Sequence, residues 1–141
     1  YNFANSTNSL VCGTGNKSEI LLGYFTKYGD AAADFFPIGG LYKTEVRQLA
    51  LQVGLPKAFL EKAPTAELCA GQTDEGEIGV KYTEIDPILL HVVKGGKTKQ
   101  QIIALGFPKK AVERVFSLMA ANKHKREQPP ILKTSAKQPY T

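Results

Sequence analysis

The sequence predicts an α/β domain in which this portion is mostly helical, with one or two sheet strands. The first observation is a short apolar run, residues 10–12, which leads into a glycine-flanked turn and then a helix-start pattern. In α/β domains a strand, turn and helix in this order place the turn at the carboxyl edge of a sheet. The second observation is helical periodicity, which dominates the chain from residue 43 onward.

The first quarter of the chain predicts the end of a helix, then a strand over residues 9–12, a turn and a second helix. Asn16 and Glu19 have the spacing of a capping box, so this helix is expected to begin near Lys17. Residues 35–42 contain a proline and two glycines and predict a loop.

Residues 43–53 predict an amphipathic helix, which Gly54 and Pro56 end. Its apolar positions follow the i, i+3, i+4, i+7 spacing, at Val46, Leu49, Ala50 and Val53. Residues 62–80 carry turn residues and little periodicity, which predicts a long polar loop. Such loops inside compact domains are usually functional or mobile.

The remaining sequence predicts three helices and a tail. Residues 86–91 begin with an Asp-Pro pair, and residues 98–106 combine a capping-box pair with a closing glycine. A third helix begins at Pro108, and its apolar face comprises Val112, Val115, Phe116 and Met119. Residues 122–141 are basic and predict an extended tail because they contain a Pro-Pro pair.

Composition limits the classes of protein. With 141 residues, 43% hydrophobic and 22% charged, the chain is one globular domain's worth. No apolar run approaches the roughly 20 residues of a membrane span, and no secretory signal is present, so no membrane partner is expected. Cys12 and Cys69 are too far apart for a CxxC pair, which favours reduced thiols and a cytoplasmic location. Because the first residue is Tyr1, we expect the chain to begin inside a longer protein.

The turn at residues 13–15 is either an anion site or simply a tight turn. It is not a P-loop, because Asn16 separates the glycine from Lys17. Thr14 could contact a base or phosphate, or cap the turn. Glu19 could close the capping box or hold Mg²⁺, and the sequence alone favours the cap.

The lysines are solvated surface groups by default. Lys43, however, stands at a predicted helix start, where a cation opposes the helix dipole unless an anion such as phosphate lies nearby. Thr65 could cap a turn or contact a phosphate. His91 and His124 are the only histidines and no GxSxG motif occurs, so a nucleophilic triad is poorly supported.

Taken in order, the sequence blocks resemble the C-terminal half of the NAD synthetase family, of the ammonia-dependent type. No single block is specific, but the combination covers nearly the whole chain. The blocks are VCGTGNKSE at 11–19, GYFTKYGD at 23–30, PIG at 37–39, LYKT at 41–44, APTAEL at 63–68, GQTDE at 71–75 and HKR at 124–126.

The resemblance implies an adenine nucleotide α-hydrolase-like (ATP-pyrophosphatase) fold, of which residues 1–141 are the C-terminal portion of a single domain. It also implies the last step of NAD biosynthesis. ATP adenylates the nicotinate carboxylate of deamido-NAD, and ammonia, free or drawn from glutamine, then displaces AMP. Family members are homodimers with deamido-NAD at the interface, and no nucleic acid is involved.

The resemblance further implies roles for individual residues. ATP is contacted by Thr14, Lys43 and Thr65, and Mg²⁺ by Glu19. Deamido-NAD is bound by Lys27, Asp34, His124 and Lys125. Residues 71–79 resemble a mobile segment that becomes ordered over the substrates.

One departure bears on activity. The family's pyrophosphate-binding loop, Ser-Gly-Gly-x-Asp-Ser, occurs nowhere in the 141 residues, so the chain alone is expected not to synthesise NAD. Two alternatives stay open. One is a basic helical module that binds nucleic acid through a helix pair and the tail. The other is a different ATP-pyrophosphatase amidotransferase.

Overall fold

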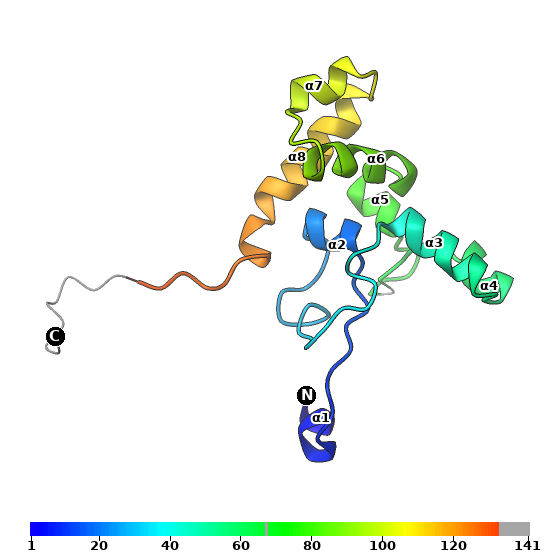
Figure 1. Cartoon of the computed structure of the whole chain (residues 1–141), viewed down its shortest axis with the longest axis vertical. Coiled ribbons are helices and arrows are strands. Elements are labelled where there is room, and N and C mark those ends of the chain that lie inside the picture. The colour runs from blue at the N-terminus through cyan, green and yellow to red at the C-terminus, as the bar shows by residue number, and fades with distance from the viewer. Residues whose placement is uncertain (67, 133–141) are drawn as a thin grey trace, which may run out of the picture.

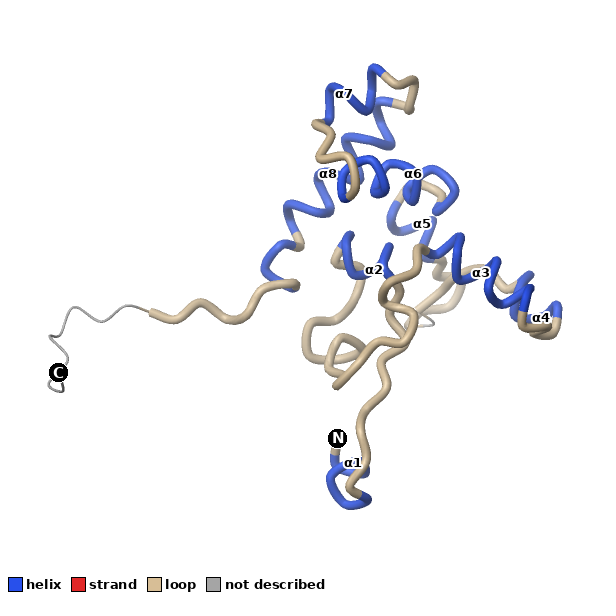
Figure 2. Tube along the Cα trace, viewed as in Figure 1, coloured by secondary structure: helices blue, strands red, loops and turns tan. Residues whose placement is uncertain are grey.

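The computed structural model describes residues 1–66 and 68–132, and this part of the chain is helical (Figures 1 and 2). A terminal helix and a long loop are followed by a group of packed helices. The elements are α1 (Asn2–Thr7), α2 (Lys17–Leu22), α3 (Lys43–Gln52), α4 (Lys57–Glu61), α5 (Asp74–Ile78), α6 (Tyr82–Val93), α7 (Lys99–Ala104), α8 (Lys109–Ala121) and the 3-10 helix η1 (Lys123–Lys125).

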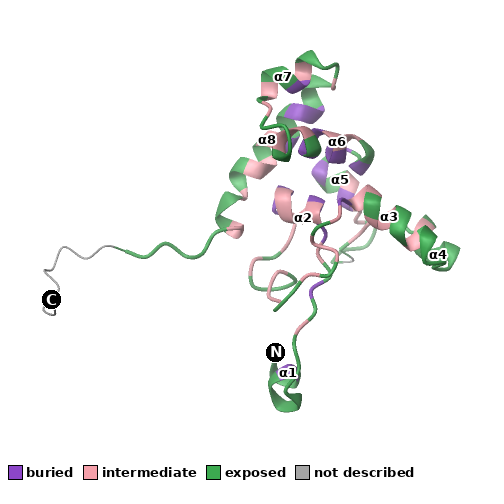
Figure 3. Cartoon of the chain, viewed as in Figure 1, coloured by how far each residue is buried: buried purple, intermediate pink, exposed green. Residues whose placement is uncertain are grey.

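The hydrophobic core lies where α6 meets α8, with α2 and α7 packed against this pair (Figure 3). The periodicity predicted for α8 is confirmed, because Val112 and Val115 are fully buried. α6 contributes most of the remaining core, since it is apolar on nearly all sides. Its fully buried side chains are Tyr82, Ile85, Ile88 and Leu89.

The predicted strand at residues 9–12 is reduced to a single contact. Within residues 1–66 and 68–132 no strand is present, and one parallel bridge joins Cys12 to Phe35. Gly13 donates to the Phe35 carbonyl at 2.8 Å, and Asp34 donates to the Val11 carbonyl at 2.9 Å. A strand needs a continuous ladder of partners, and this pairing ends after one bridge. Among the described residues, this bridge is the sheet feature that supports the predicted α/β class. The prediction that this part of the chain is mostly helical is confirmed.

Helix boundaries follow the local caps. Thr98 and Gln101 form the predicted capping box of α7, and α8 follows Pro108 as expected. α6 is the exception, because it begins at Tyr82 rather than at the Asp-Pro pair and carries Pro87 inside it. A proline in a helix interior removes one backbone hydrogen bond, and burial of Tyr82 and other apolar side chains in the first turns offsets that loss.

The structure also differs from the sequence prediction in one loop and in the C-terminal tail. The long polar loop at residues 62–80 contains the short helix α5, whose N-cap Thr73 accepts a hydrogen bond from the Gly76 amide. The predicted extended tail is wrong at its start, because η1 continues the turn after α8. Residues 133–141 of that tail, including Lys133 and Lys137, lie outside the described residues.

The predicted apolar face of α3 is not buried by the rest of the described chain. Leu49 is 39% exposed and Val53 is 63% exposed. α3 and α4 project away from the core as a helical pair (Figure 1). Among the described helices, none is both long and apolar enough to cross a membrane.

Candidate functional site

The turn before α2 is held by a closed capping box. The Asn16 side chain accepts from the Glu19 amide at 3.1 Å, and the Asn16 amide donates to Glu19 Oε2 at 2.9 Å. The turn also needs glycine, because a Cβ on Gly13 would collide with the Phe36 ring. The favoured interpretation of Glu19 as a capping residue is therefore observed.

Glu19 has a second partner, which the sequence did not reveal. Lys43 Nζ lies 2.9 Å from Glu19 Oε1, and both side chains are largely sheltered from solvent. The Lys43 ammonium also lies 5.5 Å from the centroid of the Tyr82 ring. Glu19 thus supplies an anion for the cation that stands at the start of α3.

A buried acid lies beside this ion pair. Asp74, in the first turn of α5, is only 4% exposed, and its Oδ1 has no hydrogen-bond partner among the described residues. Tyr82 donates to its Oδ2 at a long 3.4 Å. Burial raises the pKa of Asp74, Lys43 opposes that rise and the Glu19 charge adds to it. A buried carboxyl coupled to two charged neighbours is characteristic of a functional site.

Two tyrosine hydroxyls donate to carboxylates of α5. Tyr24 donates to Glu77 Oε2 at 2.6 Å, which ties the loop after α2 to α5. Burial, followed by the Glu77 hydrogen bond, raises the pKa of Tyr24 well above its usual value. Burial and the charges of Glu19 and Asp74 do the same for Tyr82. Both phenols therefore stay protonated and act as donors.

All three predicted ATP contacts and the predicted Mg²⁺ ligand line one cleft of about 740 Å³. Its walls are formed by the turn before α2, the loop after α2, the start of α3, the 62–80 segment and the segment after α8. Asp74 and Gln72 line the same cleft, and the sequence interpretation had assigned neither a role. The predicted residues there are Thr14, Glu19, Lys43 and Thr65, together with Lys125 from the predicted deamido-NAD set.

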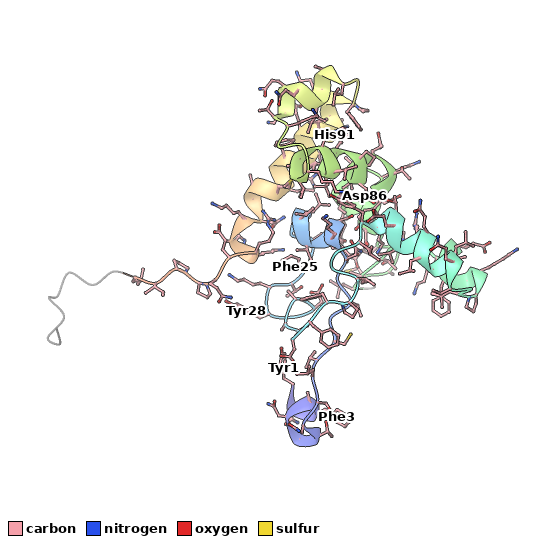
Figure 4. The ribbon with its side chains drawn as sticks, in the orientation of Figure 1. Tyr1, Phe3, Phe25, Tyr28, Asp86 and His91 are labelled. Carbon is pink, nitrogen blue, oxygen red and sulfur yellow. The ribbon has the colours of Figure 1, made fainter. Side chains whose placement is uncertain are left out.

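A second cleft of about 490 Å³ adjoins the first and contains two of the predicted deamido-NAD contacts, Lys27 and Lys125. Each ammonium lies over an aromatic ring, Lys27 at 5.6 Å from the Tyr28 centroid and Lys125 at 5.5 Å from that of Phe25. Figure 4 places both rings on the loop that follows α2. Residues that line both clefts include Gly15, Glu19, Phe25, Asp30 and Lys125.

The basic segment after α8 is bound to the carboxyl end of α2. Lys125 Nζ donates to the Gly23 and Phe25 carbonyls at 2.9 and 2.7 Å, and Asn122 Nδ2 donates to the Leu22 carbonyl at 2.9 Å. Cations and amide donors are favourable at a helix carboxyl end. Gly23 is needed here because its φ is 68° and a Cβ would collide with Asn122.

The loop and the segment after α8 also hold each other. Lys27 Nζ donates to the His124 backbone carbonyl at 2.7 Å. Arg126 donates to the carbonyls of Leu21 at 2.8 Å and Met119 at 2.6 Å. In this structure the basic residues therefore bind backbone carbonyls, and the second cleft forms where the two segments meet.

The structure does not bring two of the predicted residues into either cleft. Asp34 is exposed, and its carboxylate accepts from the Tyr1 hydroxyl at 3.1 Å and the Val11 amide at 2.7 Å. His124 is exposed and contributes only its carbonyl oxygen to the Lys27 contact. Neither side chain is among the described residues that line the clefts.

No group of three or more acidic, histidine or cysteine side chains is placed to hold a metal within the described parts of the chain. The oxygen donors of Glu19 and Asp74 nevertheless suit Mg²⁺ chemically, since Mg²⁺ prefers carboxylates and binds with few protein ligands. The unpartnered Asp74 Oδ1 fits such a role, because a buried oxygen without a donor is otherwise costly.

Comparisons with known proteins agree with the resemblance. A family model described as NAD synthase matches residues 1–129. The NH3-dependent NAD(+) synthetase of Archaeoglobus fulgidus is 50% identical over 131 residues, which are 93% of this chain and 49% of that protein. That of Methanocaldococcus jannaschii is also 50% identical over 131 residues, covering 92% of this chain and 50% of the relative. The chain thus spans about half the length of the curated relatives it matches.

Two solved structures share the fold. One, described as NMN synthetase from Francisella tularensis, superposes with a TM-score of 0.80 at 40% identity, covering 95% of this chain and 51% of the other. The other is an NH3-dependent NAD synthetase from Campylobacter jejuni in complex with nitrate, with a TM-score of 0.71 at 32% identity. It is covered to 49%, and this chain to 94%.

Proposed function

The chain belongs to the NAD synthase family, and we propose that it forms one wall of a site that amidates deamido-NAD to NAD with ATP and ammonia. The observation that carries the proposal is the convergence of Thr14, Glu19, Lys43 and Thr65 in one cleft. These residues come from three separate segments and would have no reason to meet in a nucleic-acid-binding module.

The chemistry explains why such a cleft is needed. A carboxylate is a poor electrophile, whereas an acyl adenylate has a good leaving group. In the first step the nicotinate carboxylate attacks the α-phosphorus of ATP and releases pyrophosphate. In the second, ammonia attacks the acyl carbon, the bond to AMP breaks and the amide forms. Both substrates are anions, so cations must bring them together.

In this proposal Lys43 and Thr65 bind ATP phosphates and Thr14 contacts the nucleotide. Phosphate oxygens would compete with Glu19 for the Lys43 ammonium, which lies 2.9 Å from the carboxylate in the present structure. Glu19 would then be available to hold Mg²⁺. When bound, Mg²⁺ neutralises phosphate charge.

The adjoining cleft would take deamido-NAD. Lys27 and Lys125 offer cations next to the aromatic rings of Tyr28 and Phe25, which suits a ligand with both phosphates and flat rings. Asp34 and His124 complete the proposed set from outside this cleft. A homodimer, with the partner covering the open side, is part of the same proposal.

A second candidate substrate follows from one solved relative. The structure with a TM-score of 0.80 is described as an NMN synthetase, so the amidated substrate could be a mononucleotide instead of a dinucleotide. The reaction type is the same in both cases. The two substrates differ by one adenylate, which only the longer ligand would have to place in the cleft.

The test is made on the protein that carries this chain. With ATP, Mg²⁺, ammonium and deamido-NAD, we expect NAD, AMP and pyrophosphate to form in equal amounts, measured by mass spectrometry. Nicotinate mononucleotide is tested in parallel, and its exclusive use would establish the second candidate. Failure to amidate either substrate would overturn the proposal.

The isolated chain gives a separate outcome. Because Ser-Gly-Gly-x-Asp-Ser is absent from the 141 residues, we expect these residues alone to show no ATP–pyrophosphate exchange. Clear exchange by the isolated chain would contradict the view that another segment completes the ATP site.

A further inference from the structure

A buried carboxylate lies beneath the first turn of α3. Asp86 comes from α6 and is only 4% exposed, and Ser18 of α2 is fully buried beside it. The Ser18 hydroxyl donates to Asp86 Oδ1 at 2.5 Å. Figure 4 shows Asp86 where α6 faces the start of α3.

Both residues continue into the backbone of α3. The Lys43 amide donates to Ser18 Oγ at 2.9 Å, and the Thr44 amide donates to Asp86 Oδ2 at 2.8 Å. The first amides of a helix have no partner within the helix and carry its positive dipole end. Asp86 and Ser18 thus cap α3 from neighbouring helices, and we call these two side chains with the two amides the Asp86 clamp.

The Asp86 clamp offsets the unfavourable position of a lysine at the start of α3. A cation at the first position of a helix opposes the helix dipole, and Lys43 occupies that position in α3. A carboxylate at the same end has the opposite effect. Glu19 neutralises the Lys43 ammonium, while Asp86 compensates the backbone dipole beneath it.

The clamp also joins the two residues proposed to act on phosphates and metal. Ser18 immediately precedes Glu19 in α2, and its hydroxyl binds the backbone of Lys43. A shift of α3 against α2 would therefore break the Lys43 contact and move Lys43 away from Glu19 at once. Burying a carboxylate is costly unless its oxygens are satisfied, and here the Ser18 hydroxyl and the Thr44 amide satisfy one Asp86 oxygen each.

We propose that Asp86, acting through Ser18, is a positioning residue that sets Lys43 against the ATP phosphates. The proposal rests on the proposed function for the ATP-binding role, while the placement of Lys43 itself is independent of it. Asp86 is not among the residues that line either cleft, and its effect passes through the start of α3.

The first experiment is a double-mutant cycle on the protein that carries this chain, read as the Kd for Mg-ATP. Asp86→Asn keeps the size of the side chain and removes its charge, and we expect a weakening of about tenfold, the scale of one charge-assisted hydrogen bond. In a Lys43→Met background the same change should have almost no effect, because the group that it positions is gone. An equal fold-change in both backgrounds would overturn the proposal.

A matched control separates positioning from loss of stability. Val115→Ala removes buried core volume from α8, which lies against α6, at a residue outside the Asp86 clamp. It should lower Tm without changing the Kd for Mg-ATP. If it weakens ATP binding as much as Asp86→Asn at a similar Tm, the positioning role is refuted. Should Asp86→Asn fail to fold, Ser18→Ala, which leaves the carboxylate its Thr44 contact, takes its place in both experiments.

A second readout does not depend on ATP. The rate of acetylation of each lysine by acetic anhydride is measured by mass spectrometry. A slow rate indicates that contacts restrain the amine and shield it from the reagent. Asp86→Asn should raise the rate at Lys43 several-fold and leave exposed Lys109 unchanged. A protein that binds no ATP but shows this change would refute the proposed function and leave the positioning of Lys43 intact, whereas an unchanged Lys43 rate would refute the positioning itself.

Discussion

The two clefts differ in how their lysines are held. Lys43 is fixed from below by a buried carboxylate and a buried hydroxyl, and its ammonium is paired with Glu19. Lys27 is fixed by one backbone carbonyl, that of His124, where two surface segments meet. The first arrangement belongs to the packed helices, and the second depends on how the segment after α8 docks.

This difference teaches where each cleft is vulnerable. Ligand binding in the first cleft, which Lys43 lines, should change when charges in α3 or in the side chains packed beneath it are altered. Ligand binding in the second cleft, which Lys27 lines, should weaken when the segment after α8 is loosened, even when no ligand contact is altered. The predictions below test that contrast, beginning with the largest expected effect.

Lys43→Met should lower amidation by about a hundredfold or more, the scale seen when one preorganised cation or donor is removed from a charged transition state. The measurement is kcat/KM for ATP. Lys109→Met, at an exposed lysine paired only with Glu113, is the control and should change little. Near-normal activity of the Lys43 variant would contradict its assignment to ATP.

Gly23→Ala should destabilise the fold by about 1 to 2 kcal/mol for the left-handed backbone alone. The collision of the new Cβ with Asn122 adds to that cost. The free energy of unfolding from urea denaturation measures it. Gly40→Ala, where a Cβ meets nothing within 4 Å, is the control, and equal stability of the two variants would contradict both the left-handed backbone at Gly23 and the packing of Asn122 against it.

Lys125→Met removes two hydrogen bonds to the Gly23 and Phe25 carbonyls. We expect the KM for the nicotinate substrate to rise about tenfold, the scale of one or two lost charge-assisted bonds, with a smaller change in the Kd for ATP because Lys125 also lines the first cleft. Lys123→Met, at a 71% exposed side chain, serves as its comparison. A larger effect on ATP than on the nicotinate substrate would contradict the division into two clefts.

Asp74→Asn tests how the buried Asp74 carboxyl affects the pH dependence of stability, and it should have the smallest effect of the variants described here. Because burial raises the pKa of Asp74 above 3.8, the native state favours the protonated form. Its contribution to stability is present below about pH 3.8 and is lost as the pH rises through the native pKa. The variant should therefore gain stability over the parent on going from pH 3.5 to pH 7, measured as the difference in Tm.

The contrary outcome for Asp74 is equally clear. A difference in Tm that stays constant over this pH range would show that the carboxyl titrates normally in the folded protein. Glu113→Gln, at a half-exposed carboxylate paired with Lys109, is the control for removing one exposed negative charge.

Prediction from sequence was most successful where structure is local. The capping boxes at Asn16 and Thr98 mark the starts of α2 and α7, because a cap is a contact between residues three apart. The strand at residues 9–12 was not confirmed, because a strand is defined by partners elsewhere, and its described pairing is one bridge to Phe35. The same reasoning explains α6, whose start depends on what buries Tyr82.

For the candidate site, the sequence blocks named eight residues, and six of these eight line the clefts. They did not identify Asp74, Ser18 or Asp86. Asp86 lies between apolar residues of α6, which also contains Glu84, and nothing in the sequence indicates which amides it would bind.

The sequence by itself determined the family, the local caps and the types of side chain at the site, because these depend on residue identity and short spacing. Only the tertiary structure decided that Glu19 pairs with Lys43, that Asp86 lies beneath α3 and that Lys125 binds the end of α2. These contacts join residues that are 24, 42 and 102 positions apart. The packing of separate helices and loops brings these residues together, and no periodicity along the chain predicts which of them will meet.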